Sequence, residues 1–177
     1  MISHTKTSGM YRRELGAPHL ADLAGTTFAN YIYVTPVEFR ERVELDKLGI
    51  YLITAAGNLH LGCYTSTQIL DDPQPLNLII GTGQQTPVAA QVNRMIWYEV
   101  PPQMLDAGLY WLAFLCSSNT LSVASSTPRD VMYTIRRYTY AYAPLPPTIA
   151  GLPLEIKAHD LEFPNVAALI RTGIKKP

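Results

Sequence analysis

Acidic residues are the first candidates for chemistry in this sequence, because a glycoside hydrolase needs two carboxylates flanking the scissile bond. The candidates are the pair Asp71–Asp72 and the set Glu38, Glu41, Glu44 and Asp46. The pair stands beside prolines, which is typical of a turn. The set lies mostly on one face of an alternating segment that also carries arginines, where charge pairing accounts for it. We therefore expect no enzyme.

Metal ligands and nucleophiles are equally sparse. The four histidines stand at positions 4, 19, 60 and 159, without a second ligand at metal-binding spacing. The neighbours His159 and Asp160 would face opposite ways in an extended chain. Cys63 and Cys116 each lie in an apolar stretch, which favours buried free thiols. With no nucleophile elbow, phosphate-binding loop or dinucleotide fingerprint, the sequence predicts no catalytic residue, metal site or cofactor.

Aromatic side chains give a different candidate site. Tyr138, Tyr140 and Tyr142 alternate along one predicted strand that also carries Arg136. Exposed aromatic rings beside polar groups bind the apolar face of sugars. Tyrosine is also enriched at protein interfaces, so the same row fits contact with a neighbouring subunit or with the terminal segment of the chain. The row is therefore a candidate glycan contact or a candidate interface.

Composition restricts the partners. The chain has 177 residues, enough for one ordinary domain, and its formal net charge is zero. It lacks the clustered positive charge that nucleic-acid binding needs, so we expect no nucleic-acid partner. Charged residues make up 16% of the chain, well below the roughly 25% of an average soluble domain. A surface this neutral favours coverage by a protein partner.

We also expect no membrane association. The N-terminal residues contain no apolar stretch of the kind found in signal peptides. The longest strongly apolar run, 109–116, is far shorter than the roughly 20 residues of a membrane-spanning helix. These features favour a protein made in a cytoplasm.

The elements that would position these residues are strands. Residues 1–25 are polar and are expected to form an extended arm, with one short helical turn at 17–24, ordered only on a neighbour. Residues 26–177 are expected to form the folded domain, with a Pro-rich C-terminal strand segment. Strands are predicted at 26–35 (ended by Pro36), 37–46, 48–52, 58–66, 76–80, 92–100, 108–117, 120–126, 131–143, 152–156 and 166–171.

Several details of this pattern carry predictions. Residues 37–46 alternate between apolar and charged, with Glu41 as the exception, and the alternation shifts at a bulge near 47–49. Residues 67–75 are predicted to be a surface loop, and Ser118–Asn119 a hairpin turn. Residues 108–117 form the most apolar segment, which predicts a strand buried on both faces. No amphipathic helix of three turns is present, so the sequence predicts an all-β sandwich or barrel.

The chain resembles a jelly-roll module found in structural proteins of tailed bacteriophages. The resemblance covers roughly residues 26–172, through the segments 31–36, 59–64 and 143–148 and above all 105–113. In that last phrase Gly108, Tyr110, Trp111 and Ala113 are the fold signature. The resemblance implies an antiparallel jelly-roll β-sandwich of about eight strands, a role in the virion, a homotrimer, and no catalytic residues.

The leading hypothesis is thus a non-enzymatic virion structural protein, made in the host cytoplasm, whose partners are copies of itself and other virion proteins. A capsid decoration protein, head fibre, tail fibre or baseplate component would each fit. The alternative is a carbohydrate-binding adhesin module, with a host-surface glycan as its partner. A glycosidase is a third hypothesis, which would depend on two of the carboxylates named above.

Overall fold

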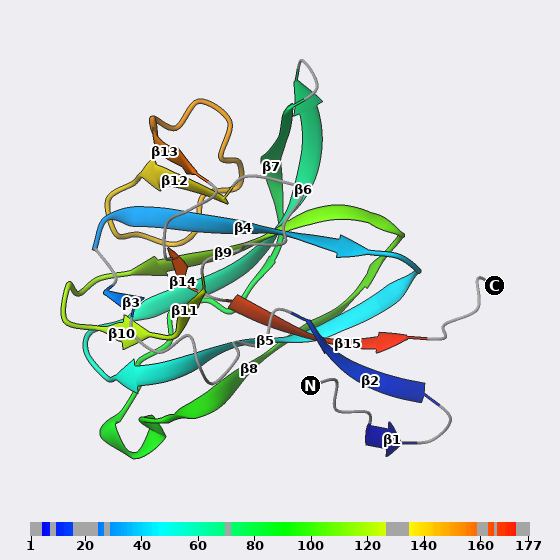
Figure 1. The fold of residues 1–177 in the computed structure, drawn as a ribbon, viewed down its shortest axis with the longest axis horizontal. Helices are drawn as coiled ribbons and strands as arrows, with labels where there is room; N and C mark the ends of the chain where they lie inside the picture. Colours follow the sequence, from blue (N-terminus) through cyan, green and yellow to red (C-terminus); the bar gives the residue numbers. More distant parts are fainter. Residues whose placement is uncertain are drawn as a thin grey trace.

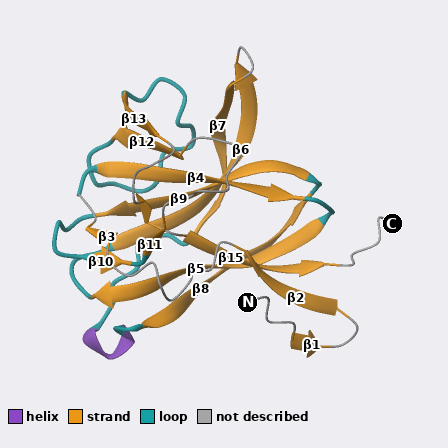
Figure 2. Cartoon of the chain, in the orientation of Figure 1, coloured by secondary structure: helices purple, strands orange, loops and turns teal. Residues whose placement is uncertain are grey.

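The structure is a computed structural model that describes residues 5–7, 10–15, 25–26, 29–69, 72–126, 135–158, 163–164 and 166–172. These residues form an all-β protein with antiparallel strand pairing (Figure 2). The only helical segment among them is a single 3-10 turn, Ala89–Gln91. The prediction of an all-β chain without amphipathic helices is confirmed for the described residues.

Two sheets account for nearly all of the strands (Figure 1). The first contains, in order, β1 (Thr5–Thr7), β2 (Met10–Leu15), β15 (Val166–Thr172), β5 (Val43–Thr54), β10 (Ser122–Val123) and β3 (Gly25–Thr26), and β8 (Arg94–Leu105) also pairs with β5. The second contains β13 (Leu154–Ala158), β12 (Ile135–Thr139), β4 (Tyr31–Phe39), β9 (Gly108–Cys116), β6 (Leu59–Ile69) and β7 (Asp72–Gly81). A separate short pair joins β11 (Ser125–Ser126) to β14 (Phe163–Pro164).

The main core lies between the two sheets. Strand β5 supplies much of it, because alternate residues of a strand point to one face. Its side chains at Leu45, Leu48 and Ile50 are fully buried. The register of β5 shifts at Asp46 against both of its long neighbours, β15 and β8. The irregularity predicted near 47–49 is therefore present, one residue earlier, and it returns the apolar residues to the inner face.

Strand β9 lies between this core and a second one, and each of its faces packs against one of them. Its residues Leu112, Phe114 and Cys116 face the main core, while Trp111, Ala113 and Leu115 belong to a separate buried cluster. All six are at most 2% exposed. The prediction of a strand buried on both faces is confirmed.

The second core exists because the second sheet is curled. Figure 1 shows the β6–β7 hairpin and the β12–β13 pair rising from the same sheet. The second core contains Ile32, Val34, Tyr64 and Tyr138, together with Ile149 from the segment after β12. This segment, residues 144–152, is fixed by backbone hydrogen bonds to β7, including Leu78 N to Pro147 O (2.9 Å) and Ile149 N to Leu76 O (2.9 Å).

Proline positions were the main source of error in the predicted strands. Strand β4 does not end at Pro36, which is buried and pairs with Trp111. On the other side of β4, among the described residues, β12 pairs only as far as Val34, so no described bond to that strand is lost at Pro36. The predicted loop 67–75 is also wrong, because most of it belongs to β6 and β7. Pro73 and Pro75 lie in β7, the edge strand of its sheet, where proline is tolerated.

Two connections differ from prediction as well. The predicted strand 37–46 is broken by a corner at 40–42 that carries the chain from the second sheet to the first, and the exceptional Glu41 stands at this corner. Ser118–Asn119 does not make a hairpin. The chain crosses there from β9 in the second sheet to β10, which pairs with β3 and β5 in the first.

Parts of the expected N-terminal arm form strands of the same chain. Residues 10–15 form β2, which pairs with β15, and β1 pairs with β2. These strands extend the first sheet at the edge formed by the C-terminal strand. The helical turn predicted at 17–24 lies outside the described residues.

Candidate functional site

The four signature residues, Gly108, Tyr110, Trp111 and Ala113, all belong to β9, whose side chains pack into two different cores. Trp111 and Ala113 are fully buried in the second core, and the indole Nε1 donates to Ser66 Oγ (3.1 Å). Tyr110 points to the other side, where its ring lies 5.1 Å from that of Phe39. Gly108 begins the strand. The phrase that carries the family resemblance is thus a packing element, which separates the two cores of the protein.

Arg136 is the most unusual residue of the second core, since it is charged and only 1% exposed. Its Nη2 donates to Asp72 Oδ1 (2.6 Å) and to the carbonyl of Pro73 (2.8 Å). Its guanidinium lies 5.5 Å from the centre of the Trp111 ring, within cation–π range. The contact joins β12 to the start of β7, so it closes the curl of the second sheet. We call Arg136, Asp72 and Trp111 the clasp.

The tyrosine row lies beside the clasp, and the chain itself covers much of it. Tyr138 is 5% exposed within the second core. Tyr140 and Tyr142 are half-buried against the same core, and the Tyr140 hydroxyl donates to Pro144 O (2.9 Å). The structure therefore brings Arg136, Tyr138 and Trp111 together. Neither Arg136 nor Tyr138 is open to solvent, so the row does not form the exposed platform that a sugar would need.

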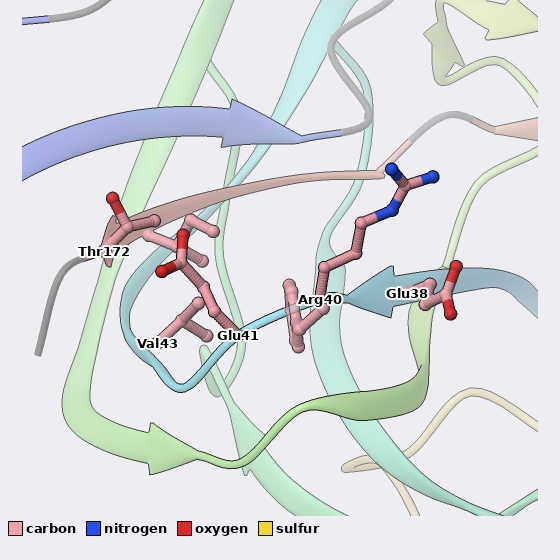
Figure 3. Close-up of a pocket in the computed structure, with 7 residues that line it drawn as sticks. Glu38, Arg40, Glu41, Val43 and Thr172 are labelled. Carbon is pink, nitrogen blue, oxygen red and sulfur yellow. The ribbon is translucent and has the colours of Figure 1, made fainter. Parts of the chain in front are cut away.

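The candidate carboxylates are divided among ion pairs and one shallow pocket. Arg171 contacts Glu44 (2.9 Å) and Asp46 (3.0 Å), and Asp72 belongs to the clasp. The pocket, of about 320 Å³, is lined by Glu38, Phe39, Arg40, Glu41, Val43, Ile170 and Thr172. Figure 3 shows the carboxylate of Glu41 near Thr172 and that of Glu38 directed away from it. These two carboxylates do not face each other across the pocket as glycoside hydrolysis requires.

The remaining reactive groups are held in apolar surroundings. His60 is 4% exposed with its ring 5.3 Å from that of Tyr142, and burial lowers the pKa of its imidazole. Burial raises the pKa of Cys63 to about 12. Cys63 pairs with Leu112 across β6 and β9, whereas Cys116 pairs with Leu59, so the two thiols are offset along the strands and form no disulfide. In the part of the chain that the structure describes, no three His, Cys, Asp or Glu side chains gather to hold a metal ion.

No protein-family model, no curated protein and no solved structure matches this chain. Within the described ranges, no helix has the length and apolar character needed to cross a bilayer. The case for a function therefore depends on the surfaces of the molecule.

One surface residue was not singled out in the sequence, Trp97. It lies in β8 opposite Gly49 of β5 and is half-buried, but belongs to neither core. Its neighbours Ile96 and Val100 are buried, which places Trp97 on the outer face of the first sheet. Two signals could have found it: an indole at an outward position of an alternating strand, and a glycine inside the facing strand, which marks a close approach.

Strand β8 is also an edge. Among the described residues it pairs with β5 alone, so its other side has no partner strand. Pro101 and Pro102 are exposed on this strand and cannot donate backbone hydrogen bonds. Residues 94–100 remain as the section of this edge on which another strand could pair.

Proposed function

We propose that this protein is a jelly-roll module and a non-enzymatic structural protein of a bacteriophage particle. A jelly roll winds eight consecutive strands into two four-stranded sheets through two Greek keys. If the strands are numbered in chain order, the sheets run 1-8-3-6 and 2-7-4-5.

The observation that carries the fold proposal is the strand order. Eight consecutive strands, β3 to β10, supply the two sheets β3-β10-β5-β8 and β4-β9-β6-β7. This order agrees with that of a jelly roll in both sheets, which supports the fold proposal. The first and eighth strands are only two residues long. Strands β15 and β2 continue the sheet beside β5 where β10 ends, and β12 and β13 extend the second sheet.

Three features support a structural role rather than catalysis. The candidate acids Glu44, Asp46 and Asp72 are occupied by arginines of the same chain. The phrase with the closest family resemblance is a packing element in β9. The chain also has few charges for its length and an open strand edge, features that suit contact with copies of itself.

The proposed assembly is a homotrimer within the virion, in contact with other virion proteins. A closed cyclic oligomer buries exposed strand edges without forming fibres. The trimer is an expectation from the family resemblance, and the free edge of β8 at residues 94–100 is a suitable place for the contact.

Native mass spectrometry of the full chain over a dilution series tests this proposal. We expect a trimer that persists at micromolar concentration, and no release of reducing ends from any polysaccharide substrate. A variant with Met95→Pro, which removes a backbone donor from the side of β8 that faces away from β5, should weaken the oligomer if β8 forms the contact. A wild-type chain that is monomeric at micromolar concentration would overturn the structural proposal.

A further inference from the structure

The indole of Trp97 lies against bare backbone. A Cβ atom added to Gly49 would stand 2.6 Å from Trp97 Cε3 and 2.7 Å from the carbonyl oxygen of Ile96. The six-membered ring of the indole therefore occupies the space that any side chain at position 49 would need. Glycine at this position lets the ring rest on the sheet, which restricts its motion before any ligand arrives.

Polar groups are fixed on both sides of this ring. On one side, Lys47 pairs with Glu99 (Nζ to Oε1, 2.9 Å), and the Glu99 side chain is 82% exposed. On the other side, the Tyr51 hydroxyl donates to the carbonyl of Asn93 (2.9 Å). Both Lys47–Glu99 and Tyr51–Met95 are the register pairs that flank Gly49–Trp97 on the same face of the sheet. Each flanking pair is about 6–7 Å away along the strand.

We propose that Trp97, Lys47 and Glu99 form a carbohydrate-binding site for a neutral hexopyranose residue. The C–H face of the sugar would stack on the indole, and its hydroxyls would bond the ammonium and the carboxylate, which together offer both donors and acceptors. The exposed carboxylate disfavours an acidic sugar. This site goes beyond the structural role and does not depend on it.

A sugar fits this surface better than a second copy of the chain does. The indole, with Met95 beside it, is bounded by a charged pair whose acidic member is mostly in solvent. A stable dimer needs a contiguous interface of about 800 Å² on each partner with charges depleted at its centre. A single sugar ring needs only the aromatic platform and its polar rim.

The two tryptophans make the site directly measurable, because Trp111 is fully buried and Trp97 is not. Acrylamide quenching of the wild-type chain should report mainly on Trp97. Glucose, galactose, mannose and N-acetylglucosamine, each titrated to about 20 mM, would saturate a site with a Kd of about 1 mM. We expect at least one of these sugars to protect Trp97 from quenching, and saturation-transfer NMR to show contact with its ring protons.

Single-residue variants test how much each residue of the site contributes to sugar binding. Trp97→Ala should weaken sugar binding at least tenfold in the NMR assay, and Glu99→Gln about threefold or more. Leu154→Ala, which changes an exposed apolar residue on β13, should leave binding unchanged. Glu99→Gln alters a side chain that is 82% exposed, so its result does not depend on refolding of the core.

Three results would overturn the site. The first is the absence of protection and NMR contact with all four sugars, and the second is binding that persists unchanged in both Trp97→Ala and Glu99→Gln. Protection of Trp97 that rises with protein concentration in the absence of sugar would assign this face to contact between copies instead, and would also refute the proposal. If the sugar site is refuted, the prediction of a trimer still stands, because native mass spectrometry tests the trimer independently of sugar binding.

Discussion

The clasp gives the sharpest quantitative prediction about the second core. Removing one partner of a buried ion pair costs about 3–5 kcal/mol of unfolding free energy. Arg136 is 1% exposed, but the Asp72 side chain is 32% exposed, so solvent helps to stabilise the carboxylate after the arginine is removed. We therefore expect Arg136→Met, which keeps an apolar stem over Trp111, to cost about 2 kcal/mol. In Asp72→Asn the arginine stays buried, with Pro73 O as a remaining acceptor, and a similar loss is expected.

The assay is urea unfolding of the two single variants and the double variant, followed by far-UV circular dichroism. The coupling energy between the two positions should be about 1–2 kcal/mol. The neighbouring pair Arg137–Glu155 is a control, because it also starts from an arginine of β12 but joins it to β13 and is more exposed, at 16% and 38%. Its coupling should stay below about 0.5 kcal/mol. A coupling below about 0.3 kcal/mol for Arg136 and Asp72 would refute the view that this pair closes the curled sheet.

Three further predictions concern buried groups. Burial raises the pKa of Cys63 to about 12, and Cys116 is buried as well. Neither thiol should therefore react with Ellman's reagent at pH 8 until the chain is denatured. Fast reaction of the folded protein would contradict the packing of β6 and β9. Because the pKa of His60 is lowered in the folded protein, its contribution to the unfolding free energy is fully present above the ordinary pKa of about 6.5. This contribution is lost as the pH falls from there towards the folded pKa. Urea midpoints measured over this range should show the loss, and the loss should be smaller in His60→Gln. Gly62→Ala should cost about 1 kcal/mol, because its Cβ would stand 2.5 Å from Leu145 Cδ1 and 3.1 Å from Leu78 Cδ1, and both side-chain ends must move aside. Its strand partner Gly81, whose Cβ would approach nothing closer than 3.4 Å, should tolerate alanine better in the same unfolding assay.

The fold class and the central strand were predictable from the sequence because they depend on short-range patterns. A long apolar run such as 109–116 can only be satisfied by burial on both faces, and β9 has that position. The bulge of β5 was also visible, because the apolar alternation changes phase there. The positions of the sheet edges could not be predicted from the sequence. Whether proline ends a strand depends on whether a neighbour needs its N–H. Within the described ranges, Pro36 has no partner on β12, and Pro73 and Pro75 lie in the edge strand β7.

The candidate site was harder to predict, because exposure of a strand face depends on what the rest of the chain does. Tyr138 and Arg136 looked like an outward row, but the segment 144–152 folds back over that face of the sheet and makes a second core. No local pattern in β12 signals this return. Trp97 has the same local appearance as Tyr138, yet it stays partly open because the structure places it on the outer face of the other sheet.

The central claim, that this chain is a repeated structural part of a bacteriophage particle, is tested most directly by analysing the particles themselves. Virions purified from cells that make this chain should contain it, when quantified by mass spectrometry against the major capsid protein, at a fixed copy number divisible by three. A cryo-electron microscopy map of the same particles should show symmetric density that fits the two-sheet fold. Purified particles that lack the chain, while the cell lysate contains it, would contradict the claim.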